Sequence, residues 1–189
     1  LAAQMFFYRA QKTTESKQNP QRTQRWVCFI MKIHITIPDQ RLILTDDDGA
    51  ILKQCLISSA RNGTGQQQGS FRTPLGRHII RAKIGAGQPV NTVFVRRRPT
   101  GEIYTPALGR QFPKRDWILT RILWLSGCEP GYNRLGSVDT MRRYIYIHGT
   151  PDSVEMGKPG SIGCIRVANH DLLALFEKVP VGTEVDISN

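Results

Sequence analysis

The sequence lacks any apolar run of the length that a membrane-spanning helix needs. Such a helix takes about 20 consecutive apolar residues, and polar or charged residues interrupt every apolar stretch of this 189-residue chain well before that length. A secretory signal is also missing, because the apolar stretch 26–31 is short and leads directly into an alternating pattern. We therefore expect no transmembrane segment and a cytoplasmic location for the sequence as it stands. A leader missing from the N-terminus would instead direct the protein to the periplasm or cell envelope.

Cysteine is scarce, and its spacing predicts neither a disulfide framework nor a metal centre. The four cysteines are Cys28, Cys55, Cys128 and Cys164. If Cys164 must stay a thiol, the other three cannot all pair with one another, which is typical of a reducing compartment. His148 and His170 do not form with Cys164 the close ligand pairs that structural zinc prefers. We expect no metal and no other cofactor.

Signatures of nucleotide and nucleic-acid binding are missing as well. The glycine-rich segment 61–69 does not end in the Gly-Lys-Ser/Thr of a phosphate-binding loop. The net charge of +11 favours an acidic partner. However, aromatic residues are not interleaved with the arginine and lysine clusters as they are in proteins that bind single-stranded nucleic acid. We therefore expect no nucleic-acid partner, and the carboxylates of a peptide are the alternative.

The N-terminal residues differ from the rest of the chain. Residues 1–25 are rich in Gln, Thr, Lys and Arg and show no hydrophobic periodicity, so we predict that 1–30 form a disordered or non-native extension. Met31 directly precedes the first regular pattern. Residues 31–189 are enough for one domain with a substantial core.

Alternation of apolar and polar residues predicts that this domain is mainly β. Successive side chains of a strand point to opposite faces, and Ile33, Ile35 and Ile37 share one face of the first alternating run. The predicted strands are 32–37, 41–45, 50–58, 77–84, 93–95, 117–125, 144–148 and 183–187. The remainder of 85–116 is predicted to be rich in loops, and its basic cluster 96–98 fits either a solvated edge or a carboxylate-binding rim.

One helix is predicted in the C-terminal region. Asn169 is a good N-cap residue, and Asp171 follows in the first turn. Apolar residues then recur at helical spacing and predict a packing face. They are Leu172, Leu175, Phe176 and Val179. The pattern as a whole predicts an antiparallel β-sandwich or a partly open barrel with this one helix and a catalytic cysteine loop.

The segment 142–166 carries the candidate chemistry. Tyr144, Tyr146 and His148 share one face of a predicted strand, and His148 is placed at its end. Cys164 follows 16 residues later, after several small residues that let the backbone turn tightly. A thiol that returns to a nearby imidazole can act as a nucleophile. The alternative from the residues alone is that Cys164 is a small core residue and His148 has no chemical role.

The order of the residues in this segment resembles the YkuD-type L,D-transpeptidase catalytic domain. The resemblance rests on His148-Gly149-Thr150, on the run 161–166 (SIGCIR), and on Asn169 and Asp171. The Thr-Pro-x-Gly at 73–76, before a predicted strand, also recurs in the family. One departure is Ile162, which stands where the family most often has histidine. That second imidazole is not the base, so we expect the chemistry to survive.

The resemblance implies a role for each residue of the motif. Cys164 is the nucleophile, His148 is the base, and the backbone carbonyl of Gly149 orients the imidazole. The backbone N–H groups of Gly163 and Cys164 stabilise the oxyanion. The resemblance also implies that insertions at 85–116 cover the active-site cleft as a lid.

Four further residues are candidates for substrate binding: Arg166, Ser161, Tyr146 and Arg121. Arg166 could hold a substrate carboxylate or lower the thiol pKa, and the alternative is a salt bridge to Asp171. Ser161 could hydrogen-bond either its own loop or the substrate. Arg121 interrupts a strand that is apolar on both faces, so it should either lie at the edge of the substrate cleft or pair with an acid.

The implied activity is cysteine-dependent acyl transfer on peptidoglycan stem peptides. Cys164 would cleave the bond between the diamino acid at position three and D-Ala at position four. An amine acceptor would give a 3→3 crosslink, whereas water would give a trimmed tripeptide, as in a cytosolic L,D-carboxypeptidase that acts on recycled tetrapeptides. A non-catalytic basic module that binds cell-wall peptide or nucleic acid is the remoter alternative.

Overall fold

The computed structural model describes residues 31–189, so the predictions for 1–30 and for Cys28 lie outside the described residues. Ten strands, two α-helices and one 3-10 turn follow one another along this part of the chain. They are β1 (Lys32–Thr36), β2 (Arg41–Thr45), β3 (Ile51–Ser58), β4 (Gly76–Ile84), β5 (Thr92–Val95), β6 (Arg98–Ile103), α1 (Pro106–Gln111), β7 (Ile118–Gly127), η1 (Gly136–Val138), β8 (Tyr146–Gly149), β9 (Ile165–Val167), α2 (Asn169–Lys178) and β10 (Glu184–Ser188).

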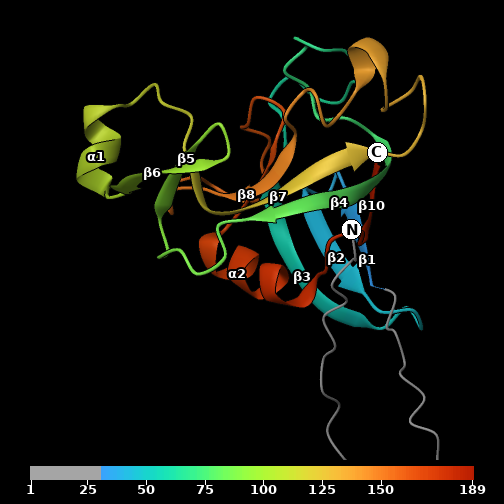
Figure 1. The fold of residues 1–189 in the computed structure, drawn as a ribbon, viewed down its shortest axis with the longest axis horizontal. Helices are drawn as coiled ribbons and strands as arrows, with labels where there is room; N and C mark the ends of the chain where they lie inside the picture. The colour runs from blue at the N-terminus through green and yellow to red at the C-terminus, as the bar shows by residue number, and fades with distance from the viewer. Residues whose placement is uncertain (1–30) are drawn as a thin grey trace, which may run out of the picture.

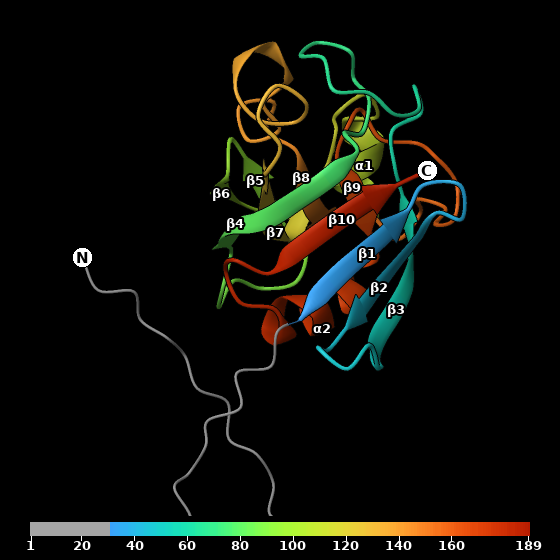
Figure 2. The same ribbon diagram turned by 90° about the vertical axis from the view of Figure 1, so that its right-hand side faces the viewer.

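All ten strands belong to one sheet that closes on itself. The strand order is β4-β10-β1-β2-β3-β9-β8-β7-β5-β6, and an additional pairing of β4 with β7 joins the two halves. Figure 2 shows β4, β10, β1, β2 and β3 side by side. The pairs β1–β10 and β8–β9 are parallel, and the other pairs are antiparallel. The prediction of a mainly β fold with one main helix near the C-terminal end is therefore confirmed.

The region 85–116 contains more regular structure than its sequence indicated. The expected strand at 93–95 is β5, but it pairs with β6 as a hairpin, and the short helix α1 follows. Figure 1 shows β5, β6 and α1 projecting at one end of the molecule. The hairpin is attached to the barrel because β5 also pairs with β7.

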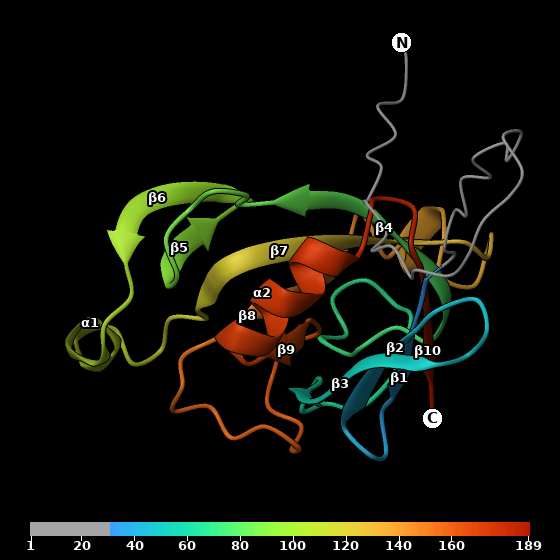
Figure 3. The same cartoon turned by 90° about the horizontal axis from the view of Figure 1, so that it is seen from below.

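The main core lies inside the closed sheet and is sealed by α2. Its buried side chains come from β1, β2, β3, β4, β7, β8, β9 and β10 and from α2. The predicted packing face of the helix is correct, since Leu172, Leu175, Phe176 and Val179 are all buried in this core. Full burial of such a side chain contributes about 1.5–3 kcal/mol. Figure 3 shows α2 lying across β7 and β8, the two strands with which it is in contact.

Asn169 has a different role from the predicted one. The helix begins at this residue, and the N-cap position is taken by Ala168, which makes no side-chain cap hydrogen bond. The Asn169 amide instead donates to the Thr150 carbonyl and to Asn91 Oδ1, both at 3.0 Å, and accepts from Thr120 Oγ1 at 2.6 Å. The start of α2 is thereby tied to β7 and to the residue that follows β8.

None of the helices within 31–189 combines the length and the apolar character that crossing a bilayer would take.

His78 is a buried histidine that belongs to the scaffold. It is 1% exposed, and its Nδ1 lies 2.8 Å from the Gly76 carbonyl while Nε2 lies 3.1 Å from Thr140 Oγ1. A carbonyl only accepts, so Nδ1 carries the proton and the Thr140 hydroxyl donates to Nε2. Burial lowers the pKa of His78 to about 4.

We expect His78 to make the stability of the fold pH-dependent. The pKa is depressed in the folded state relative to 6.5 in the unfolded chain, so the contribution is fully present above pH 6.5 and is lost as the pH falls toward 4. The loss is at most about 3 kcal/mol. Urea unfolding of His78→Gln should show a shallower pH dependence than the wild type in this window. His170→Gln, which removes an exposed imidazole, should follow the wild-type curve; equal slopes for all three proteins would contradict the assignment.

Candidate active site

The parallel pair β8–β9 brings the two halves of the motif together. Its register sets Ile147 opposite Ile165 and His148 opposite Arg166, so Cys164, directly before β9, comes opposite Tyr146. The isoleucines are buried in the main core. Side chains alternate along each strand, so Cys164, Arg166, Tyr146 and His148 share the other face.

His148 is held as a neutral base with one free nitrogen. It is fully buried, and its Nδ1 lies 2.8 Å from the Gly149 carbonyl. Because the carbonyl only accepts, Nδ1 carries the proton, and the lone pair is on Nε2, a buried atom without a hydrogen-bond partner. Burial lowers the pKa of His148, against the opposing effects of Asp116 and of the hydrogen bond to Gly149. An unsatisfied buried acceptor costs about 1–3 kcal/mol and is typical of a functional position.

Gly149 has a steric role besides its carbonyl. A Cβ atom at this position would collide with Asn169 Oδ1 and would lie 2.7 Å from the Leu119 carbonyl oxygen. Any side chain here would therefore push β8 away from β7 and from the start of α2. Position 149, whose carbonyl accepts the hydrogen bond from His148 Nδ1, therefore requires glycine, because only glycine allows β8 to lie this close to β7 and α2.

The surroundings of the Cys164 thiol favour its protonated form. Its Sγ accepts from the Tyr146 N–H at 3.4 Å and donates to the Tyr144 carbonyl at 3.5 Å. Within residues 31–189 these two backbone groups, and not the His148 ring, are its hydrogen-bond partners. Burial raises the pKa of Cys164 to about 12, although the Tyr146 N–H and nearby arginines oppose this. The thiol and the imidazole are thus neighbours on one face and are both neutral.

Arg166 pairs with Asp116, so the alternative of a salt bridge to Asp171 is wrong. Its Nη2 lies 2.6 Å from Asp116 Oδ1, whereas Asp171 pairs with Lys53 at 2.7 Å. The Arg166 Nε is buried and has no partner. Asp116 raises and Arg166 lowers the pKa of both His148 and Cys164, so this ion pair lies beside the reacting groups. The sequence carried no signal for Asp116, which ends a loop-rich region.

The loop before Cys164 is fastened from within by Ser161. The buried Ser161 hydroxyl accepts from the Gly163 N–H at 3.2 Å and donates to the Cys164 carbonyl. Thr73 Oγ1 donates to the Gly163 carbonyl at 3.0 Å. Gly163 has a φ of 132°, a conformation that only glycine adopts readily. Of the two uses expected of Ser161, the structure shows the bond within its own loop, and Ile162 points outward with an exposed side chain.

Arg121 lies away from this group of residues. Its Nη1 donates to the carbonyls of Gln88 and Thr120, and its guanidinium lies 5.5 Å from the centre of the Phe176 ring. Phe176 belongs to α2 and to the main core, so Arg121 is on the helix side of β7. No acid forms a salt bridge with it among the described residues. Two carbonyls and an aromatic ring surround its guanidinium instead, so Arg121 does not join the residues around Cys164.

Tyr146 keeps its place on the face of His148, but Tyr144 does not continue the strand. β8 begins at Tyr146, and Tyr144 has a φ of 58° and is 51% exposed. The predicted strand 144–148 was therefore too long by two residues. Both tyrosines lie near Trp124 and Arg97, a grouping that the sequence did not predict because these residues are far apart in the chain.

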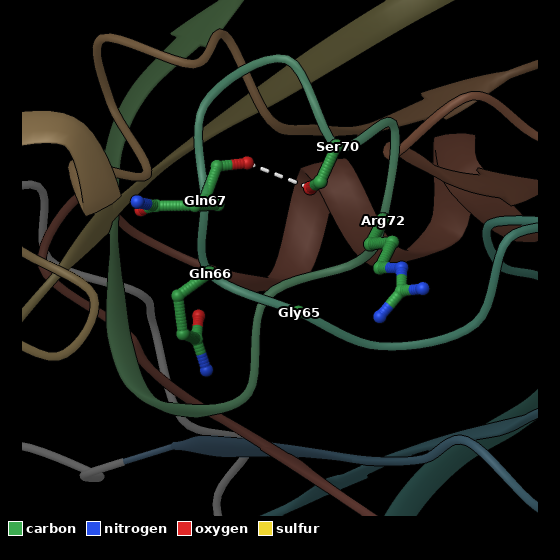
Figure 4. A pocket seen from close by; sticks show the side chains of 5 residues that line it. All are labelled: Gly65, Gln66, Gln67, Ser70 and Arg72. Atoms are coloured by element: carbon green, nitrogen blue, oxygen red, sulfur yellow. Dashed lines mark hydrogen bonds between the residues drawn. The ribbon is translucent and has the colours of Figure 1, made fainter.

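A polar loop borders the same site. A cavity of about 530 Å³ is lined by Gly65, Gln66, Gln67, Ser70 and Arg72, and Figure 4 shows the loop curving around it with Ser70 hydrogen-bonded to Gln67. Arg143 fastens this loop by donating to the carbonyls of Gly65, Gln66 and Arg72. Arg143 also lowers the pKa of Cys164. The loop that lines the cavity therefore lies next to the cysteine loop.

Known proteins share this sequence pattern. A family model described as the L,D-transpeptidase catalytic domain, YkuD, matches residues 31–187. The chain is 49% identical over 168 residues to the probable L,D-transpeptidase ErfK/SrfK of Escherichia coli K12, covering 81% of this chain and 48% of that protein. It is 32% identical over 161 residues to the probable L,D-transpeptidase YbiS of the same strain, covering 80% and 48%. The chain thus spans about half the length of the curated relatives it matches.

The fold also resembles solved structures. The crystal structure of L,D-transpeptidase 3 from Mycobacterium tuberculosis, in complex with a faropenem-derived adduct, gives a TM-score of 0.53 at 13% identity. The match covers 85% of this chain and 61% of that chain. At this identity the likeness concerns the fold.

We expect Cys164 to react slowly with small alkylating agents. A thiol with a pKa of about 12 has far less thiolate near neutral pH than an unperturbed cysteine with a pKa of about 8.5. Iodoacetamide labelling of Cys164, followed by peptide mass spectrometry, should be at least about tenfold slower at about pH 8 than in the urea-unfolded chain. The rate should still be rising at about pH 10; a plateau near neutral pH would show that a thiolate is already formed.

Proposed function

The chain belongs to the YkuD family of L,D-transpeptidase catalytic domains, and we propose that it transfers acyl groups of peptidoglycan stem peptides through Cys164. The observation that supports this proposal best is the state of His148. Its Nδ1 is hydrogen-bonded to the Gly149 carbonyl, its Nε2 is buried without a partner, and Cys164 is on the same face of the neighbouring strand. A base with a free nitrogen beside a thiol is what nucleophilic catalysis needs.

The first step forms an acyl-enzyme. Cys164 Sγ attacks the carbonyl carbon between the diamino acid at position three and D-Ala at position four, and His148 Nε2 takes the thiol proton. The carbon–nitrogen bond then breaks, and the proton goes to the leaving amine of D-Ala. Because burial raises the pKa of Cys164 to about 12 and lowers that of His148, the resting pair is neutral, and the thiol proton passes to Nε2 during the reaction.

Backbone N–H groups stabilise the oxyanion in this proposal. The candidates are those of Gly163 and Cys164, and the first already donates to Ser161 Oγ. The loop must therefore exchange this bond for one to the oxyanion as the substrate binds. Losing one such donor typically costs about 2.7–4 kcal/mol in the barrier.

The second step decides the product. An amine of a second stem peptide gives a 3→3 crosslink and regenerates the thiol, and water gives a tripeptide. The names of the curated relatives favour the transpeptidase outcome, and the trimming carboxypeptidase is the alternative that product analysis separates. The cytoplasmic location stays a prediction from the sequence.

Cys164→Ala should abolish turnover of a disaccharide tetrapeptide. The wild type should release D-Ala and give a covalent adduct with a tetrapeptide or a carbapenem, seen by intact-protein mass spectrometry. His148→Gln should lower the acylation rate by roughly 10²–10⁴-fold, the usual contribution of a general base. Cys128→Ser, which changes a partly buried thiol outside this group, serves as the matched control. A wild type that forms no adduct would leave only a binding module.

The pH profile of acylation should reflect the lowered pKa of His148. The neutral imidazole is the active form, and burial lowers its pKa below 6.5. The rate constant kcat/KM for acylation reports groups of the free enzyme. It should therefore hold as the pH falls to 6.5 and decline only at lower pH. An acid limb with its midpoint at or above 6.5 would contradict a buried neutral base.

A further inference from the structure

The turn of the β5–β6 hairpin has an unusual composition. Val95 pairs with Arg98, so the two-residue turn consists of Arg96 and Arg97, whose φ angles are 48° and 67°. Turns of this kind need positive φ at both central residues and usually contain Asn-Gly, since a Cβ atom is strained in this conformation. Two arginines are therefore a costly choice, and strain of this kind calls for a compensating contact.

Arg97 finds such a contact in a group of three aromatic side chains. Its guanidinium lies 4.8 Å from the centre of the Trp124 ring and 4.6 Å from that of Tyr144, and its Nη1 donates to the Tyr146 hydroxyl at 3.2 Å. Arg97 is half-buried there, whereas Arg96 and Arg98 are exposed. Trp124, Tyr144 and Tyr146 are called the aromatic cage below.

The aromatic cage adjoins the nucleophile. The Tyr146 N–H donates to Cys164 Sγ, and Sγ donates to the Tyr144 carbonyl. Trp124 and Cys164 pack in the same apolar cluster. The cage therefore borders Cys164.

The lining of the cage selects for a cation. Aromatic faces attract cations through their ring quadrupole, and the Tyr146 hydroxyl can accept a hydrogen bond. No carboxylate forms a salt bridge with Arg97 among residues 31–189, so the aromatic rings and this hydroxyl compensate its charge. The group that occupies the cage in this structure is likewise a cation, the Arg97 guanidinium.

We propose that the aromatic cage is a binding subsite for a primary ammonium group of the substrate, and that Arg97 fills it until the substrate displaces it. The proposal rests on the proposed function, because the diamino acid of a stem peptide supplies such an ammonium group. Displacement of Arg97 removes the side chain that fastens the tip of the hairpin to the cage. The ammonium could belong to the acyl donor or to the amine acceptor.

A binding experiment tests the cage without relying on activity. n-Butylammonium is titrated into ¹⁵N-labelled protein, and the indole N–H resonance of Trp124 is followed. Arg97→Gln keeps a hydrogen-bonding group for Tyr146 but removes the competing cation, so we expect at least about fivefold tighter binding than in the wild type. Arg98→Gln removes the same charge from an exposed neighbour and should match the wild type. n-Butanol, a neutral probe of similar shape, should bind weakly to the wild type and to both variants.

Loss of one wall should abolish ammonium binding. Tyr144→Leu keeps an apolar side chain at an exposed position, so the fold should tolerate it, and Phe112→Leu is the matched control for an exposed aromatic residue. The proposal is overturned if the double variant Arg97→Gln/Tyr144→Leu binds n-butylammonium as tightly as Arg97→Gln alone. It is also overturned if n-butanol binds as tightly as the cation.

Kinetics separate the two sources of the ammonium group. Tetrapeptides with a free or an acetylated side-chain amine are compared as acyl donors, and amines are compared with water as acceptors of a preformed acyl-enzyme. Tyr144→Leu should lower the preference for the free amine about 5- to 10-fold in the acylation arm if the donor binds the cage, or in the acceptor arm if the second stem does. No change in either arm would overturn the substrate role. If no peptide acylates Cys164 while n-butylammonium binds, the proposed function fails and the cation site stands.

Discussion

The parallel pairing of β8 with β9 is the contact on which the candidate site depends. It places Cys164 beside the strand of His148 although 16 residues separate them in the chain. A parallel pair needs a crossover of a dozen or more residues, and here a loop of small and polar residues makes it. The core-facing side chains of both strands are fully buried, and the Asn169 amide ties the following helix to β7. Core packing on one face of β8 and β9 thus fixes the positions of His148 and Cys164 on the other face.

Burial sets the protonation states of this site. It lowers the pKa of His148 and raises that of Cys164, so both groups are neutral at rest. The Asp116–Arg166 ion pair beside them has opposing effects on each pKa and leaves burial dominant. A neutral pair has little reactivity toward small electrophiles, because the thiolate is the nucleophilic form. Reaction then depends on a substrate that brings the acyl carbon to the sulfur and lets the proton pass to Nε2.

The hairpin that extends the barrel contacts the aromatic residues around the thiol. β5 is anchored on β7, but the turn beyond it reaches back through Arg97 to the aromatic residues around Cys164. The proposed competing cation would replace these contacts of Arg97 and so remove what compensates the strained turn. The region that the family resemblance marks as a lid is thus connected to the site by a cation–aromatic contact of this chain's own residues.

The amino-acid sequence by itself determined the local features of this protein. Alternation of apolar residues predicted most of the strands, helical spacing predicted the buried face of α2, and the residues around His148 and Cys164 indicated the family. These features depend on neighbours in the chain, where the periods of strand and helix act directly. The predicted strand 144–148 began two residues too early. Tyr144 has a positive φ and lies outside the strand, although the sequence there still alternates between polar and apolar residues.

Only the tertiary structure decided which distant residues meet. In the structure Arg166 pairs with Asp116, and Arg121 lies on the helix side of β7. Asn169 ties α2 to β7, and the pairing of β4 with β7 closes the sheet. Each of these contacts joins segments that are far apart in the sequence, and a charge or an amide carries no local mark of its partner. The partner is chosen by the packing of the whole core, in which burial makes every unpaired polar group costly.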